Sequence, residues 1–398
     1  MKEYIASVSG STRTFSHANR QWPTHEVRSW LQQDLRLNFP PFEHLEAGQD
    51  PRLARYLVDH GVFNDLLQPQ NVILLAPRGG GKSAFRVRLS YECRIRRRRK
   101  ILTLLVRSPG PAWAHEGEAL YRWLNWSVAA EMLFQFAYRP YEYKRLDASL
   151  RRALTDFVNA YFVNNDFFME RLAEELTLAP LIHYLDPAMQ GLPAQPFANS
   201  LNEFVDLWRS VEPSQVSNRV PSEDWQRVTD TLIENLDYEF IYLLVDGIDD
   251  WPMREEDRLG LIQWVSERCS NKVYAKYFAP LDLKENALVS EKSLTNVAAY
   301  HIIKWDRISL QEVIRQRIAA ASSGSFDAFL ALGDENFPEG VEKLLANEVS
   351  PAIPRELLLL AQRVFKHHLQ ALGPNGRLVY EDVEGALYWY RDYKKTTS

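Results

Sequence analysis

The chain has 398 residues, of which 46% are hydrophobic and 25% are charged, and it contains only two cysteines. This composition is typical of a globular protein and excludes collagen-like chains, disordered chains and disulfide scaffolds. The formal net charge of −5 gives no global positive field for nucleic acid, and no apolar run reaches the ~18 residues of a membrane helix, so we expect a cytoplasmic protein without a membrane partner.

Residues 1–70 are predicted to be an N-terminal segment that leads into the core. Within it, Asp50 followed by Pro51 matches a helix N-cap and a first-turn proline. This pair predicts a helix from Asp50 to about His60.

Five apolar runs of strand length follow, at 71–76, 101–106, 240–245, 273–278 and 298–305. Unbroken apolar runs are typical of parallel strands that are buried on both faces, and helical stretches separate these runs. The pattern predicts an α/β fold with five buried strands, whose core comprises 71–110 and 238–309.

Helical periodicity fills the remainder of the chain. Residues 111–237 are predicted to be a helical insert, in which Trp123, Trp126, Phe134 and Phe136 recur at helical spacing and are interpreted as core rather than as base-stacking platforms. Residues 310–398 are predicted to be a C-terminal helical domain, with breaks at 322–324, 337–338 and 373–376.

A glycine-rich segment lies between the first apolar run and a predicted helix. Three glycines let the backbone approach phosphate closely, Lys82 supplies a positive charge, and Ser83 supplies a hydroxyl for Mg²⁺. Ala76 stands where the usual phosphate-loop pattern has its first glycine. The residues predicted to contact the nucleotide here are Ala76, Pro77, Arg78, Gly79, Gly80, Gly81, Lys82, Ser83 and Ala84.

An acidic residue at the end of a second buried strand is needed opposite Ser83. Residues 240–245 form such a strand, and Asp246 follows them directly. We therefore expect Asp246 and Ser83 to bind the Mg²⁺ of an ATP complex. A guanine-specific Asn-Lys-x-Asp pattern is not completed at 271–274, because Tyr274 stands at its last position, and this favours ATP over GTP.

The sequence Asp246-Gly247-Ile248-Asp249 resembles the Walker B segment of STAND ATPases and of related additional-strand P-loop ATPases, which are close relatives of AAA+ proteins. The resemblance covers roughly residues 40–110 and 238–390. It implies a P-loop NTPase three-layer sandwich with a mainly parallel five-stranded sheet, the large helical insert and a C-terminal helical lid.

Most AAA+ proteins place a water-activating glutamate directly after the magnesium acid, where this chain has Gly247. The STAND pattern implies that Asp249 takes that role, with Asp250 as its neighbour. Alternatively, both aspartates cap a helix that begins near Met253.

The segment Ala352–Leu357 resembles the sensor 2 segment of AAA+ proteins, which implies that Arg355 reaches the γ-phosphate. Alternatively, Arg355 is a surface arginine in a first helical turn after Pro354. The fourth apolar run ends at Tyr277–Pro280, without the Asn, Ser or Thr of a sensor 1.

A basic run, Arg94–Lys100, follows the predicted phosphate-loop helix. Cations stabilise a helix C-terminus, so a solvated helix end is the first interpretation, and contact with a polyanion or an acidic partner is the alternative.

Three functions remain open from these residues. The first is a nucleotide-dependent ATPase switch with a protein partner or effector, in bacterial defence or signalling, in which Lys82, Asp249 and Asp250 serve hydrolysis that is slow or partner-dependent. The second is an ATP-bound sensor or scaffold that hydrolyses weakly, and the third, suggested only by the basic run, is a nucleic-acid-stimulated ATPase. Homo-oligomerisation is compatible with each of them.

Overall fold

The computed structural model describes residues 22–58, 60–96, 100–106, 117–162, 165–186, 198–212, 214, 219–248, 255–269, 272–283 and 298–397. The chain divides into two compact units: one is Glu46–Lys304, and the other joins Met1–Leu45 to Trp305–Ser398.

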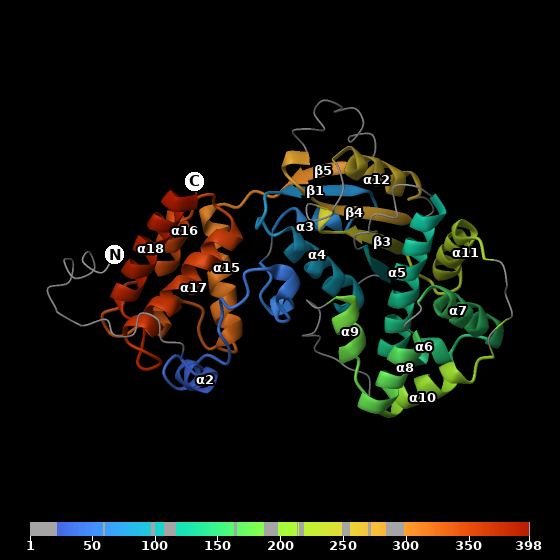
Figure 1. Cartoon of the computed structure of the whole chain (residues 1–398), viewed down its shortest axis with the longest axis horizontal. Helices are drawn as coiled ribbons and strands as arrows, with labels where there is room; N and C mark the ends of the chain where they lie inside the picture. Colours follow the sequence, from blue (N-terminus) through green and yellow to red (C-terminus); the bar gives the residue numbers. More distant parts are fainter. Residues whose placement is uncertain are drawn as a thin grey trace. The chain divides into compact units, whose positions relative to one another are not determined.

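The larger unit is built on a sheet of β1 (Val72–Ala76), β2 (Ile101–Val106), β3 (Phe240–Val245), β4 (Val273–Pro280) and β5 (Ala299–Ile302). The strand order is β2-β3-β4-β1-β5, and every neighbouring pair is parallel (Figure 1). The predicted α/β class is confirmed, and the sheet is wholly rather than mainly parallel. Because the strands are parallel, the loops that follow β1 and β3 leave the same edge of the sheet.

β5 differs from the prediction of a strand buried on both faces. Ala299 is exposed, and Tyr300 retains 42% of its accessible surface. β5 lies at the end of the strand order beside β1. β2, at the other end of the order, is buried and packs against α5, so an end position alone does not expose a strand. The apolar run alone overestimated the burial of β5.

Helices lie on both faces of the sheet. α4 (Lys82–Tyr91) packs on β1 and β4, and it ends in a π-helical turn, Glu92–Arg96. α12 (Glu255–Glu267) lies over the opposite face (Figure 1), where the Tyr277 hydroxyl donates to the Ile262 carbonyl at 2.9 Å. The larger unit thus has helix, sheet and helix layers.

Lys276 of β4 is a buried lysine whose side chain contacts the segment just before β1. Its Nζ donates to the carbonyls of Gln68 and Gln70, both at 2.6 Å, and lies 4.4 Å from the centre of the Tyr242 ring. Burial lowers the pKa of Lys276 to about 7, against a smaller opposing effect of the Cys93 and Cys269 thiols.

The described residues between β2 and β3 fold as helices. These are α5 (Gly117–Tyr138), α6 (Pro140–Lys144), α7 (Ala148–Tyr161), α8 (Asn165–Glu175), α9 (Ala179–Leu185), α10 (Ala198–Arg209) and α11 (Pro221–Glu234). α5 packs on β2 and buries Phe134 and Phe136, as predicted for core aromatics, whereas Trp123 and Trp126 of the same helix are only half-buried. In the part of the chain that the structure describes, no helix combines the length and apolar character needed to cross a membrane.

The helix predicted from Asp50 to His60 is wrong. Two 3₁₀ turns, Ala47–Gln49 and Leu53–Arg55, flank Asp50 instead, and α3 (Phe63–Leu66) follows them. The Asp50 carboxylate accepts from the Arg52 amide at 3.1 Å and from the Tyr56 hydroxyl. Such local side-chain hydrogen bonds offer the backbone an alternative to a helix.

The smaller unit is helical. It contains α2 (Thr24–Gln33), α15 (Arg307–Ala321), α16 (Val341–Glu348), α17 (Pro354–Ala371), α18 (Tyr380–Thr397) and a 3₁₀ turn, Phe329–Leu332. The predicted breaks fall between these helices. Trp22 Nε1 donates to the Leu369 carbonyl at 2.9 Å, and Trp30 Nε1 donates to the Gly376 carbonyl at 2.7 Å. These contacts hold 22–45 in the smaller unit, so the segment 1–70, which the sequence treated as one stretch leading into the core, is divided at Leu45 and Glu46 between the two units.

Two adjacent histidines of α17 converge on one carboxylate of α18. His368 is fully buried, with Nδ1 2.7 Å from Asp382 Oδ2, and its ring stacks on Trp30. His367 Nδ1 lies 3.3 Å from Asp382 Oδ1. Burial acts to raise the pKa of Asp382, but the hydrogen bonds from both histidines and the charge of His368 outweigh it, so the pKa is lowered.

Asp382→Asn is expected to lower the free energy of unfolding at pH 7 by about 2–3 kcal/mol, because it removes charged hydrogen bonds. The pKa of this carboxyl is lower in the folded state, so its stabilisation is present above the unfolded-state value of about 4 and is lost as the pH falls through the folded-state value. Urea unfolding at pH 7 and at pH 3 measures the effect. The exposed Asp392→Asn on the same helix is the control, and a deficit for Asp382→Asn that did not shrink at pH 3 would contradict the prediction.

Candidate functional site

The loop between β1 and α4 has a backbone that requires glycine. Gly79 and Gly81 have φ values of 81° and 95°, which lie in the left-handed region. A Cβ on Gly80 would lie 2.9 Å from the Pro77 carbonyl oxygen and from the Ala76 Cβ. Strand, loop and helix follow one another in the predicted order, and the Gly80 amide donates to the Pro77 carbonyl at 2.9 Å within the loop.

Lys82, the first residue of α4, keeps its ammonium group against this loop. The side chain is only 6% exposed, and Nζ donates to the Ala76 carbonyl at 3.1 Å. A positive charge is thereby held beside a helix N-terminus, where anions bind favourably.

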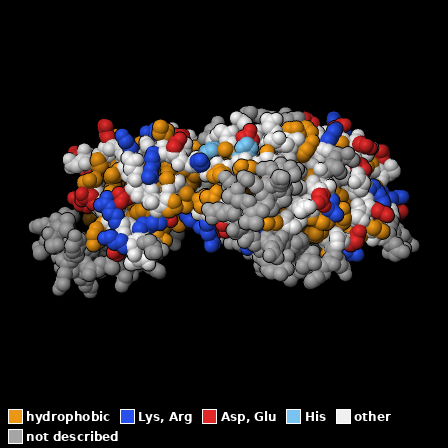
Figure 2. All heavy atoms as spheres, turned by 90° about the horizontal axis from the view of Figure 1, so that it is seen from above, with side chains coloured by type: hydrophobic (Ala, Val, Ile, Leu, Met, Phe, Trp, Pro, Cys, Tyr) orange, Lys and Arg blue, Asp and Glu red, His pale blue; other side chains and the backbone are white. Residues whose placement is uncertain are grey.

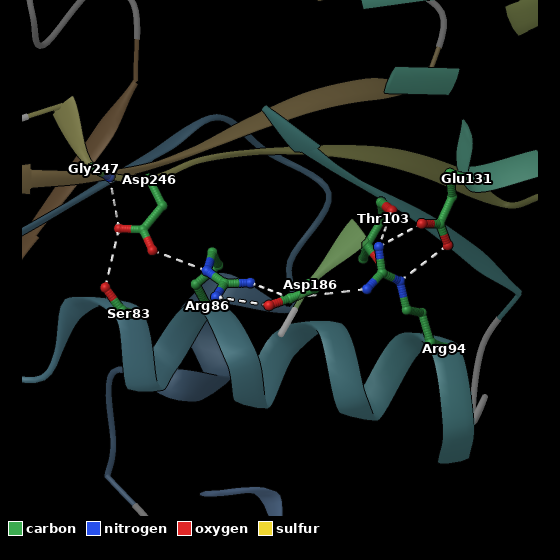
Figure 3. Close-up of polar contacts among 8 residues, drawn as sticks. All are labelled: Ser83, Arg86, Arg94, Thr103, Glu131, Asp186, Asp246 and Gly247. Atoms are coloured by element: carbon green, nitrogen blue, oxygen red, sulfur yellow. Dashed lines mark hydrogen bonds and ion pairs between the residues drawn. The ribbon is translucent and has the colours of Figure 1, made fainter. Parts of the chain in front are cut away.

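Ser83 and Asp246 meet, as the sequence predicted. Ser83 Oγ donates to Asp246 Oδ1 at 3.4 Å, and the Gly247 amide donates to the same oxygen at 2.9 Å (Figure 3). Mg²⁺ prefers oxygen ligands and is commonly held by one or two protein groups together with phosphates and waters. The hydroxyl and the carboxylate fit that requirement. Among the described residues, no group of three His, Cys, Asp or Glu side chains forms a metal site of its own.

Gly247 adopts a left-handed conformation, with φ of 75°. A side chain at this position would be strained, so the backbone favours the glycine that stands where AAA+ proteins carry glutamate. Asp249 and Asp250 lie outside the described residues, so their assignment as water-activating groups stays a prediction.

Arg355 belongs to the smaller unit, in the first turn of α17 after Pro354. The first-turn position matches the sequence. Its contact with a nucleotide stays a prediction, as do the contacts of Arg78 and Ala84.

Arg86 is a site residue that the sequence analysis missed. Its Nε donates to Asp246 Oδ2 at 2.9 Å, and its Nη2 donates to Asp186 Oδ1 at 3.2 Å, while Nη1 pairs with Asp186 Oδ2 (Figure 3). Burial acts to lower the pKa of Arg86, but the charges of Asp186 and Asp246 outweigh it and raise the pKa. The signal was present, because Arg86 follows Lys82 by four positions and therefore lies on the same face of the helix.

The basic run begins with a buried residue rather than a solvated one. Arg94 is 4% exposed, its Nε donates to Glu131 Oε1 of α5 at 3.0 Å, and its Nη2 donates to the Thr103 carbonyl at 3.3 Å. Burial raises the pKa of Glu131 against the lowering effect of Arg94. The interpretation as a solvated helix end is wrong for Arg94. The side chains of 95–99 lie outside the described residues.

These ion pairs form a continuous buried row along α4. From the sheet edge to α5 the charges alternate: Asp246, Arg86, Asp186, Arg94 and Glu131, with Arg94 Nη1 4.0 Å from Asp186 Oδ2. Three carboxylates and two guanidiniums leave one net negative charge. The row connects the Ser83 and Asp246 pair to the helices between β2 and β3.

Acidic and basic side chains are interspersed among the described atoms on the face that Figure 2 draws. Strand-tracking nucleic-acid proteins need a basic stripe or groove. The described atoms of this face offer no such stripe.

No model of a known protein family matches the chain, and a search of curated proteins finds no similar sequence.

Arg94→Met is expected to lower the free energy of unfolding at pH 7 by about 3–5 kcal/mol, because it leaves the Glu131 carboxylate buried without its guanidinium. A buried carboxyl whose folded-state pKa is raised destabilises the fold once it ionises, so the deficit relative to the wild type should grow as the pH rises from 5 to 8. Urea unfolding at both pH values tests this. The double variant Arg94→Met/Glu131→Leu should recover most of the stability, and a double variant as unstable as the single one would contradict the pairing.

Proposed function

We propose that the chain binds ATP with Mg²⁺ at the loop between β1 and α4 and that the bound nucleotide acts as a conformational switch. The observation that carries this proposal is the meeting of Ser83 and Asp246. A hydroxyl and a carboxylate from segments far apart in sequence lie 3.4 Å apart, next to a glycine-rich loop and the buried Lys82. That combination matches the chemistry of a magnesium–triphosphate complex.

The strand order supports the proposal. β4 lies between β1, which leads into the loop, and β3, which leads to Asp246. Ligands of open parallel sheets also bind beyond the carboxyl ends of the strands, where both segments lie.

Each side chain has a distinct role in this proposal. The loop amides and the N-terminus of α4 receive phosphate oxygens, and Lys82 exchanges its carbonyl contacts for the β- and γ-phosphates. Ser83 and Asp246 hold Mg²⁺, which neutralises charge on the phosphates. Asp249, or its neighbour Asp250, would polarise water, and a protein partner would recognise the resulting nucleotide state.

Lys82→Ala is expected to weaken ATP binding in the presence of MgCl₂ by about 10- to 100-fold, because a charge-assisted contact to phosphate contributes roughly 1.5–3 kcal/mol. Calorimetric titration with ATP measures the dissociation constant. The matched control is Lys144→Ala, a lysine whose side chain is 68% exposed. ATP affinity unchanged in Lys82→Ala, with both variants folded by circular dichroism, would contradict the proposed site.

A second candidate function is an ATP-bound sensor or scaffold that hydrolyses its nucleotide slowly. The left-handed Gly247 favours it, because the backbone disfavours a glutamate directly after Asp246. Nucleotide binding alone would then set the conformation that a partner recognises.

Single-turnover hydrolysis of ATP separates the two functions. For the switch that hydrolyses ATP, Asp249→Asn is expected to slow hydrolysis by about 10²- to 10⁴-fold, the usual contribution of a general base, with ATP affinity preserved. Asp250→Asn is measured beside it, and the variant with the larger loss of rate identifies the aspartate that polarises water. If the wild-type rate is already close to that of Asp249→Asn, the sensor is favoured.

A further inference from the structure

Arg86 divides its guanidinium between two carboxylates that come from different parts of the larger unit. Nε contacts Oδ2 of Asp246 at 2.9 Å, whereas Nη1 and Nη2 contact the two oxygens of Asp186 (Figure 3). A planar fork facing two carboxylate oxygens is the stronger geometry. Asp186 therefore holds the fork, and Asp246 receives a single N–H.

This division matters for a metal at Asp246. Oδ1 of that carboxylate already faces Ser83 Oγ and the Gly247 amide, and Oδ2 faces Arg86. A guanidinium and Mg²⁺ are both cations that seek carboxylate oxygens, so they compete for the same group. The more N–H groups of Arg86 turn toward Asp246, the weaker metal binding becomes.

Asp186 restrains that competition. Arg86 is 4% exposed, and a buried guanidinium requires a carboxylate partner. If Asp186 lost its charge, Nη1 and Nη2 of Arg86 would form stronger hydrogen bonds with the charged Asp246, which Arg86 already contacts through Nε.

Asp186 also belongs to a definite piece of the fold. It follows α9 directly, and its amide donates to the Ile182 carbonyl at 2.8 Å, so its position depends on that helix. α9 packs against α5 and α8, within the helices between β2 and β3.

We propose that Asp186 is a positioning residue through which these helices set the Mg²⁺ affinity of the Ser83 and Asp246 site. This inference rests on the proposed function. With α9 in place, Asp186 holds the Arg86 fork and leaves Asp246 able to accept the metal. A partner that displaced α9 would release Arg86 onto Asp246 and lower the metal affinity.

The test is ATP binding measured by calorimetry across a MgCl₂ series and in EDTA. Asp186→Asn preserves shape and removes the charge, and it should raise the MgCl₂ concentration for half-maximal enhancement of binding by on the order of tenfold, the effect of one charged contact. Its ATP affinity in EDTA should equal that of the wild type. The double variant Asp186→Asn/Arg86→Met removes the competing cation and should return the midpoint to the wild-type value or below it.

Asp224→Asn is the matched control, because Asp224 is equally buried among the helices between β2 and β3 but pairs with Arg219 and Tyr161 rather than with Arg86 or Arg94. Its midpoint should equal that of the wild type. A merely structural ion pair would change thermal stability in Asp186→Asn and leave the MgCl₂ midpoint unchanged, and that result would overturn the inference.

If Asp186→Asn does not fold, the double variant Asp186→Asn/Arg86→Met tests the inference instead, because it lacks both the Asp186 carboxylate and the Arg86 guanidinium. A midpoint above the wild-type value would then overturn the inference. Wild-type protein that binds ATP no better than Lys82→Ala would overturn the proposed function together with the inference, whereas normal ATP binding with an unshifted midpoint in Asp186→Asn overturns the inference alone.

Discussion

The carboxylate of Asp246 is the contact on which the candidate site depends. It accepts from Ser83, Arg86 and the Gly247 amide, and so it ties the first two turns of α4 to the end of β3 across the intervening strand β4. A charge in this half-buried position needs partners. Arg86 is one of these partners, and because it is buried it needs a second carboxylate, Asp186. Asp186 in turn lies near Arg94, which pairs with Glu131. The Asp246 carboxylate, which follows β3, is thus linked through ion pairs to the helices that follow β2.

The sequence predicted most of the framework because its signals are local. A buried parallel strand reads as an apolar run, and four of the five runs are strands with buried interiors. The loop was predictable because left-handed backbone and close approach select glycine at Gly79, Gly80 and Gly81. The pairing of Ser83 with Asp246 followed from parallel topology, since residues after parallel strands share one edge.

The sequence could not predict features that depend on contacts with distant residues. Nothing near Asp186 distinguishes it from a surface aspartate, and its role requires Arg86, one hundred positions earlier. Arg94 looked like part of a solvated basic run because Glu131, its partner, lies in a different helix. Asp50 matched an N-cap locally, but the Tyr56 hydroxyl gave its carboxylate another partner. β5 has strand-like residues, and only the strand order shows that it lies at the edge.

The smaller unit is discontinuous in sequence, and this has a consequence for the order in which a growing chain can fold. The indoles of Trp22 and Trp30 donate to carbonyls at Leu369 and Gly376. Ribosomal synthesis proceeds from the N-terminus, so these partners emerge only after the whole of Glu46–Lys304 has been made. The larger unit can therefore collapse first, while α2 stays attached to it without its native partners. Until residues 369–376 have been made, the indoles of Trp22 and Trp30 lack the carbonyls that they contact in the folded unit.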